Sequence, residues 1–166
     1  FVDGNKVRFR FGFPEKFGGW VKHNANTYQG KARRLHNWVA LDSSDLLGVG
    51  THLKYYIEEG TTFNDITPVR ATTSSGDVTF SATNGSSTVT VTDAAHGANL
   101  NDFVTFSGAA TLGGLVTATV LNQEYQIQSL ISSNSYTITV GVTANSSDTG
   151  SGGGSVVGTY QLNVGT

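Results

Sequence analysis

The sequence lacks cysteine and methionine, and only two of its 166 residues are proline. Without cysteine, neither a disulfide framework nor a thiolate metal site can form. No apolar run approaches the roughly 18 residues that a membrane-spanning helix needs, so we expect no membrane partner. Because methionine is absent and the chain opens on Phe1, we expect it to be an internal part of a longer protein.

Basic residues are missing from more than half of the chain. All ten Lys and Arg residues lie in the first 70 positions, where seven acidic residues leave a net charge of +3. Residues 71–166 carry five acidic residues, a net charge of −5, and are rich in Thr, Ser, Gly and Val. This change of composition predicts two domains, residues 1–75 and residues 76–164.

Alternating apolar and polar residues predict β-strands along the whole chain. In residues 7–13, apolar side chains fall at every second position, the period of a half-buried strand. A meander of three short strands is expected at residues 35–41, 46–50 and 53–57. Later strands are expected at residues 78–81, 88–92, 103–106, 124–130, 136–142 and 156–162, with a hairpin turn at Asn84-Gly85 and loops at 113–114 and 150–155.

No segment has a convincing helical period over more than two turns. The predicted fold class is therefore all-β, with a partial propeller-like meander followed by a small barrel or sandwich module. The first 70 residues hold more apolar surface than three or four strands can cover, so we expect them to pack on further chain or on neighbouring subunits. The apolar residues concerned are Phe9, Phe11, Phe13, Trp20, Trp38, Leu47 and Tyr55.

Motifs for catalysis are scarce. The sequence has no nucleophile-elbow motif, no phosphate-binding lysine loop and no pair of histidines at metal-ligand spacing. Of the scattered histidines, His36 in a strand and His96 in a turn are interpreted as structural. No cofactor is expected.

Acidic residues close in sequence do not form a convincing site. Asp42 and Asp45 are interpreted as turn-capping residues, because two acids without a third ligand make a weak calcium site. The adjacent Glu58 and Glu59 would point to opposite faces of a strand, which disfavours a polysaccharide-degrading enzyme. We therefore expect no enzymatic activity.

Four arginines in the first 70 residues could bind an anionic partner. Arg8 and Arg10 share one strand face, and Arg33 and Arg34 are adjacent in the chain. In a groove or a lumen they could contact the phosphate backbone of DNA without reading its bases. The alternative, which we favour because +3 is a small excess for a DNA-binding domain, is pairing with acids such as Glu15 within or between subunits. These four arginines are the candidate subunit-interface or DNA-contact residues.

The first 70 residues carry a more specific pattern than a periodic strand. Phe1–Trp20 reads FVDGNKVRFRFGFPEKFGGW, and Arg33–Trp38 (RRLHNW) and Gly48–Tyr56 (GVGTHLKYY) follow it. In this combination the segment resembles the opening part of tail nozzle proteins of short-tailed bacteriophages, also labelled tail tubular protein B or packaged-DNA stabilisation protein. Proteins of that family are several times longer than this chain.

The resemblance implies a β-propeller-based platform repeated around a ring of six copies. Such a ring lies beneath the portal and the tail adaptor protein, and double-stranded DNA passes through its channel without being read. The implied partners are further copies of the chain, the adaptor, other tail proteins and DNA. The implied location is the tail of the virion.

Residues 76–164 resemble a small β-barrel-like module inserted in phage virion proteins. The matching phrases are Thr88–Gly97, Asp102–Gly108 and Asn134–Val140. The module is labelled by its likeness to a half-domain of ubiquitin-activating enzyme, but a chain without cysteine cannot perform thioester chemistry. The resemblance implies a decoration or interaction module.

Together these features predict a structural component of a bacteriophage virion, a tail nozzle subunit that forms a ring to conduct and retain genomic DNA. The alternative is a β-rich binding module of a phage or bacterial surface adhesin, which residues 76–164 alone would support equally well. Cations confined to one part of the chain favour the nozzle, because a nozzle has an assembly-facing platform and an outward insert.

Overall fold

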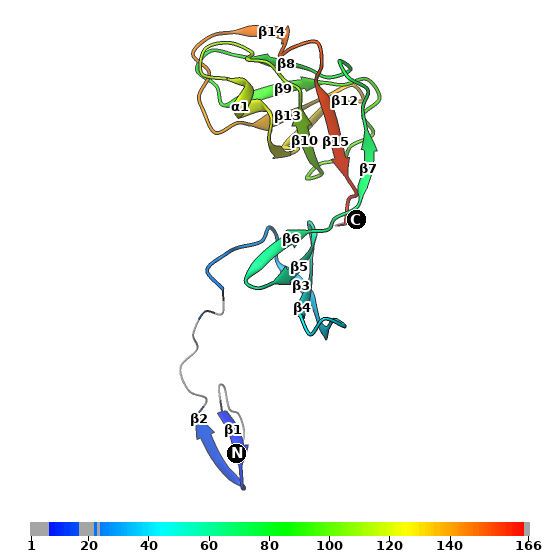
Figure 1. Cartoon of the computed structure of the whole chain (residues 1–166). Helices are drawn as coiled ribbons and strands as arrows, with labels where there is room; N and C mark the ends of the chain where they lie inside the picture. The colour runs from blue at the N-terminus through cyan, green and yellow to red at the C-terminus, as the bar shows by residue number, and fades with distance from the viewer. Residues whose placement is uncertain (1–6, 17–21, 23, 165–166) are drawn as a thin grey trace.

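The computed structural model describes residues 7–16, 22 and 24–164 (Figure 1). Phe1–Lys6, Phe17, Trp20 and His23, which the sequence patterns include, lie outside the described residues. Within them, strands β1–β15 form antiparallel sheets, and the one α-helix, α1 (Ala118–Leu121), is a single turn. No helix in this part of the chain is long and apolar enough to cross a membrane. The predicted all-β class is confirmed.

A two-stranded hairpin opens the described chain. Its strands are β1 (Val7–Arg10) and β2 (Phe13–Lys16). The single strand expected over residues 7–13 is wrong, because the chain reverses at Phe11 and Gly12, whose φ angles are 51° and 82°. Two successive positive φ angles suit the tight turn that best matches the twist of a hairpin.

The reversal changes which side chains share a face of the hairpin. Arg8 pairs with Glu15, and Arg10 pairs with Phe13. Directly paired residues point to the same side of a sheet, so Phe13 lies on the face of the arginines and not with Phe9. The expected face made only of apolar side chains is therefore absent from the described hairpin.

The next sheet is a four-stranded meander. Its strands, in the order of both sequence and space, are β3 (Ala32–Val39), β4 (Asp45–Thr51), β5 (Tyr55–Glu59) and β6 (Thr62–Asp65). The alternation pattern located the first three strands but missed β6. Four antiparallel strands in sequential order are also the unit of a propeller blade.

Two further sheets form a sandwich (Figure 1). One sheet has the order β11-β10-β15-β7, with β11 (Glu124–Gln126), β10 (Phe103–Ser107), β15 (Val157–Gln161) and β7 (Val69–Thr72). The other has the order β12-β13-β9-β8-β14, with β12 (Ser129–Ser132), β13 (Ser135–Thr139), β9 (Thr88–Thr92), β8 (Thr79–Ala82) and β14 (Asp148–Ser151). The described sheets keep open edges, so this part is a sandwich rather than a barrel.

Alternation explains why these strands bury one face. In Thr88–Thr92 the two valines are fully buried and the end threonines are exposed. The apolar side chains of both sheets form one core, whose members all lie between Val78 and Tyr160. At its centre the rings of Phe80 and Phe106 meet edge to face, with centroids 5.0 Å apart.

Two features of the sandwich differ from the sequence interpretation. The strand expected at residues 124–130 is two strands, β11 and β12, in different sheets. The glycine-rich run at 150–155, expected to be a loop, contains the end of β14. In addition, β7 precedes the expected boundary at residue 75 but pairs with β15, and the amide of Leu162 donates to the carbonyl of Pro68 at 2.7 Å.

A chain of hydrogen bonds crosses the core of the sandwich. The hydroxyl of Tyr160 donates to Asp93 Oδ2 at 2.6 Å, so the hydroxyl of Tyr136, 2.8 Å away, donates to Tyr160. All three side chains are buried. Burial raises the pKa of both tyrosines well above its usual range, since a phenolate here would lose its hydration.

The meander and the sandwich meet at a buried lysine. Lys54 Nζ lies 2.6 Å from Asp65 Oδ2 and 2.5 Å from Glu124 Oε1, and it lies 4.4 Å from the centre of the Phe103 ring. Burial alone would lower the pKa of Lys54, but the hydrogen bonds from its ammonium to the two carboxylates outweigh burial and raise it. Burial alone would raise the pKa of Asp65, but hydrogen bonds from Lys54, Thr67 and Gln161 together outweigh burial and lower the pKa of that carboxyl.

Replacement of Lys54 by methionine tests this junction. The substitution keeps most of the volume but leaves two carboxylates facing each other without a cation. We expect it to lower the free energy of unfolding by about 3 kcal/mol, as for other broken buried ion pairs. Urea unfolding measures the loss. Lys31→Met, at an exposed position, is the matched control and is expected to stay within about 0.5 kcal/mol of the parent. A junction variant as stable as this control would contradict the role given to Lys54.

The buried tyrosines predict a loss of stability in alkaline solution. Below pH 10 both the folded and the unfolded chain keep these phenols protonated, so they contribute no pH dependence there. Above pH 10 the unfolded chain releases the protons while the folded core retains them, which costs about 1.4 kcal/mol per tyrosine at pH 11. Unfolding titrations between pH 8 and 11 measure the slope, and Tyr136→Phe should make it shallower. Phenolate absorbance at 295 nm from all six tyrosines in the folded protein at pH 11 would contradict this account.

Candidate functional site

The tip of the hairpin, residues Arg10–Phe13, presents apolar side chains to solvent. Phe11 is 89% exposed and Phe13 is 75% exposed, and Phe9 behind them is 59% exposed. Among the described elements, β1 and β2 make extensive contact only with each other, and Figure 1 shows the hairpin apart from the meander and the sandwich. Exposed apolar surface of this kind makes the tip a candidate contact surface.

The two arginines of the hairpin have different surroundings. Arg8 Nε donates to Glu15 Oε2 at 2.9 Å, and both side chains remain about half exposed. An exposed pair of this kind contributes at most about 1 kcal/mol. The guanidinium of Arg10 lies 5.6 Å from the centre of the Phe11 ring. The tip therefore combines a cation with two phenyl rings.

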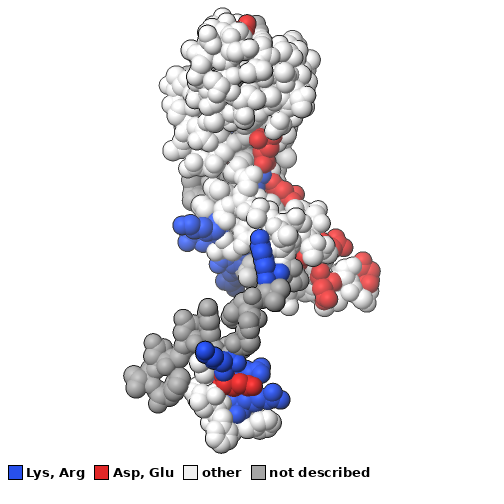
Figure 2. Space-filling view, turned by 90° about the vertical axis from the view of Figure 1, so that its left-hand side faces the viewer, with Lys and Arg blue, Asp and Glu red and all other residues white. Residues whose placement is uncertain are grey.

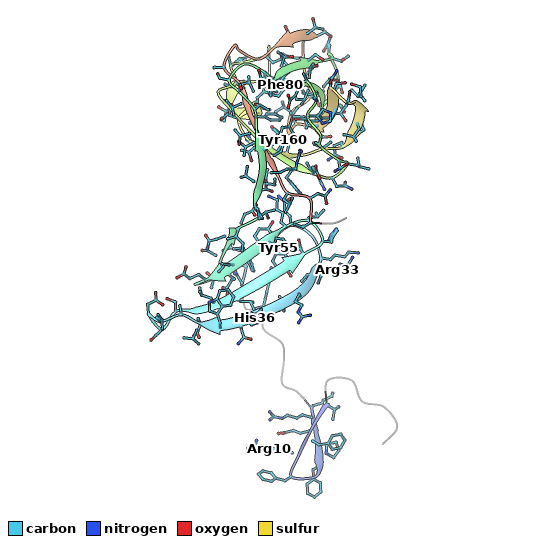
Figure 3. All side chains as sticks on the ribbon, turned by 90° about the vertical axis from the view of Figure 1, so that its right-hand side faces the viewer. Arg10, Arg33, His36, Tyr55, Phe80 and Tyr160 are labelled. Atoms are coloured by element: carbon cyan, nitrogen blue, oxygen red, sulfur yellow. The ribbon has the colours of Figure 1, made fainter. Side chains whose placement is uncertain are left out.

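One face of the meander carries aromatic and basic side chains next to glycine residues, and we call it the open face. Pairing places Arg34 beside Gly50 and Tyr55, and His36 beside Gly48. These side chains line a shallow apolar cavity of about 260 Å³. Figure 3 labels His36 and Tyr55 on this sheet and Arg33 at its side.

Glycine at position 48 lets an indole lie against the sheet. A Cβ atom on Gly48 would stand 3.2 Å from Cζ3 of Trp38, closer than nearly all real contacts of that type. The Trp38 ring in turn stacks on His36, with centroids 5.6 Å apart and planes 23° apart. His36 thus has the structural contact expected for it, although its side chain is exposed.

Arg33 and Arg34 come together at one end of the meander. The pairing of β3 with β4 shifts between Ala32 and Arg34, so Arg33 sits in a bulge. Both arginines line an open cavity of about 430 Å³ with His52 and Tyr55. The four candidate arginines therefore occupy two separate places, the hairpin and this end of the sheet.

The opposite end of the meander is acidic. Sequential strand order brings the β3–β4 turn and the β5–β6 turn to the same end of the sheet. We call that end the acidic end, and it consists of five exposed residues: Val39, Leu41, Asp42, Asp45 and Glu59. Figure 2 shows acidic side chains on one side of the meander and basic side chains on the other.

Spacing along the chain does not reveal the acidic end, because topology brings its residues together. Asp42 does cap its turn, as expected, by accepting a hydrogen bond from the amide of Ser44 at 3.0 Å. Hydrogen bonds from Ser44 lower the pKa of Asp42. The acidic end therefore keeps this charge into mildly acidic solution.

The remaining candidates serve the fold. His96 Nδ1 accepts a hydrogen bond from the amide of Ala98 at 3.0 Å, and its ring meets the Tyr136 ring edge to face. Glu58 is buried and Glu59 is exposed, on opposite faces of β5. In the described ranges, no three His, Cys, Asp or Glu side chains are grouped so that they could hold a metal ion.

Comparisons with known proteins give little that bears on these surfaces. No protein-family model matches the chain, and no curated protein matches it. Among solved structures, the chain is similar to an endosialidase of phage phi92, with 16% identity and a TM-score of 0.44. The match covers 74% of this chain and 17% of the endosialidase, and a likeness of that level carries no argument about function.

Proposed function

We propose that this chain is part of a structural protein of a bacteriophage virion, a tail nozzle subunit that assembles with further copies of itself. The sequence pattern of Phe1–Trp20 supports the family, and the observation that carries an assembly role is the exposed hairpin. The nozzle lies in the tail of the virion and conducts and retains genomic DNA.

The energetics of the hairpin support a docking role. A two-stranded hairpin alone is marginally stable in water. Burial of an exposed phenylalanine side chain contributes about 2 kcal/mol, so docking of Phe11 and Phe13 would stabilise both the hairpin and the complex. Phe11 also adopts a backbone conformation that is unfavourable for a bulky residue, which indicates a side chain kept for contact rather than for the turn.

The proposed partners follow from this function. Copies of the chain form a closed ring of six through heterologous contacts, next to the tail adaptor protein and other tail proteins. Double-stranded DNA passes through the ring. The sequence favours acidic partners, but the described residues supply no ion pair for Arg33 or Arg34, so we assign these two arginines to the phosphates of DNA. Their common cavity with His52 supports this assignment over the hairpin arginines, since Arg8 already pairs with Glu15.

The alternative, a binding module of a surface adhesin, has one observation in its favour. The open face offers Tyr55 and the Trp38–His36 stack beside Arg34, a combination suited to a ligand with both apolar and polar groups. An adhesin module would be a monomer or a two-fold dimer, whereas the nozzle requires a closed ring, so the oligomeric state and its symmetry discriminate between them.

Phe11→Asn separates docking from folding. An Asn-Gly pair is the most favourable sequence for this turn, so the hairpin should form at least as well as in the parent. Loss of the phenyl ring removes about 2 kcal/mol of burial, and the association constant should fall by about thirtyfold. Sedimentation velocity over a concentration series measures it.

The control for this variant is Leu115→Asn, which removes an exposed apolar side chain from the sandwich. We expect the control to associate as the parent does. A parent chain that stays monomeric at all concentrations would contradict the assembly role and favour the adhesin alternative. Equal weakening by both variants would show that the loss is not specific to the hairpin.

Replacement of Arg33 and Arg34 by alanine tests the contact with DNA. Each phosphate contact contributes about 0.9 to the slope of log K against log salt, so the double variant should reduce this slope by about 1.8. Fluorescence anisotropy with a duplex of arbitrary sequence measures the slope. An unchanged slope would favour acidic protein partners for these arginines, and Lys22→Ala with Lys31→Ala is the charge-matched comparison.

A further inference from the structure

The hairpin tip and the acidic end have complementary chemistry. The tip offers two exposed phenyl rings and the guanidinium of Arg10. The acidic end offers two exposed aliphatic side chains, Val39 and Leu41, beside carboxylates. Each surface thus presents an apolar pair bordered by charge, and the charges have opposite sign.

No segment of the described part of the chain occupies either surface. The tip makes no extensive contact with the other described elements. The exposed state of Leu41 shows that no described segment covers the acidic end. Exposed apolar groups in two places on one molecule are the requirement for a heterologous contact, in which one surface of each copy meets a different surface of the next.

Charge also selects between the possible pairings. Two tips brought together would place Arg10 of one copy against Arg10 of the other, and two acidic ends would place carboxylates against carboxylates. Like charges that face each other across an interface cost free energy and suppress the wrong pairing. Only the pairing of a tip with an acidic end brings opposite charges together.

We infer that the hairpin tip of one copy docks on the acidic end of the meander sheet of a second copy, with Phe11 and Phe13 against Val39 and Leu41. Arg10 lies beside Asp45, which pairs with Val39 and shares its face, and Glu59 adds negative charge at the same end from the other face of the sheet. This inference rests on the proposed assembly and names the surfaces that make it. The contact is head to tail, so every copy uses both surfaces, and repetition of the contact yields a closed ring or a filament.

Two complementary charge reversals test the inference in the full chain. The tip variant is Arg10→Glu, and the end variant combines Asp45→Lys with Glu59→Lys. In the tip variant a negative tip meets a negative end, and in the end variant a positive tip meets a positive end. For each variant alone, the association constant should be lower than that of the parent by a factor of about ten or more.

Mixing the two variants provides the decisive measurement. In an equimolar mixture, the positive tip of the end variant meets the negative end of the tip variant, and the negative tip meets the positive end. Both contacts are then favourable, so the mixture should recover the assembly that neither variant shows. Sedimentation velocity and native mass spectrometry record it, and alternation of the two variants should appear in the masses.

The control is Asp77→Lys, at an exposed position of the sandwich, which makes a charge change of the same kind outside both surfaces. It should associate as the parent does. Variants that assemble alone like the parent, or a mixture that fails to assemble, would overturn the inference. If Phe11→Asn still weakens assembly in that case, the proposed function stands and the hairpin docks elsewhere. A parent that remains monomeric, including one whose tip folds back on its own acidic end, would overturn both.

Discussion

The position of the sandwich relative to the meander depends on the ammonium of Lys54. Three segments each contribute one charged side chain to this junction. Lys54 precedes β5, Asp65 ends β6 and Glu124 begins β11. A buried cation must have its carboxylate partners nearby, and this requirement fixes distance and direction more strictly than apolar contact does. The core of the sandwich holds its two sheets together, and Lys54 joins that body to the preceding sheet together with the hydrogen bond from Gln161 Nε2 to Asp65 Oδ2, at 3.0 Å.

Most acidic residues of the sandwich add little charge to its surface. Of the acids after residue 70, Asp93 and Asp102 are buried and Glu124 faces Lys54, so few remain to give the sandwich surface a field. The visible surface of the sandwich in Figure 2 is nearly uncharged. The clearest separation of charge in the structure therefore lies within the first 70 residues, where the meander has a basic end and an acidic end.

Alternation in the sequence was sufficient to predict an all-β chain and several strands, such as Thr88–Thr92, whose bounds agree with the structure. It failed where the backbone departs from regular extension. Periodicity cannot register the reversal at Phe11, because Phe11 and Gly12 continue the pattern of the strand before them. For the same reason residues 124–130 appeared as one strand, although the chain passes from one sheet to the other within them. The candidate arginines could be named from sequence, but the acidic end could not, since only strand order brings Leu41 and Glu59 to one place.

The pairing of β7 with β15 has a topological consequence. The chain enters the sandwich through β7 and leaves it through the neighbouring strand β15. The hydrogen bond from the amide of Leu162 to the carbonyl of Pro68 joins the two segments at the base of the sandwich. The sandwich is thus an excursion whose two attachment points are adjacent. A body attached in this way can be enlarged, exchanged or lost in evolution without moving what it is attached to, because the gap that it leaves is only one strand spacing wide, about 5 Å.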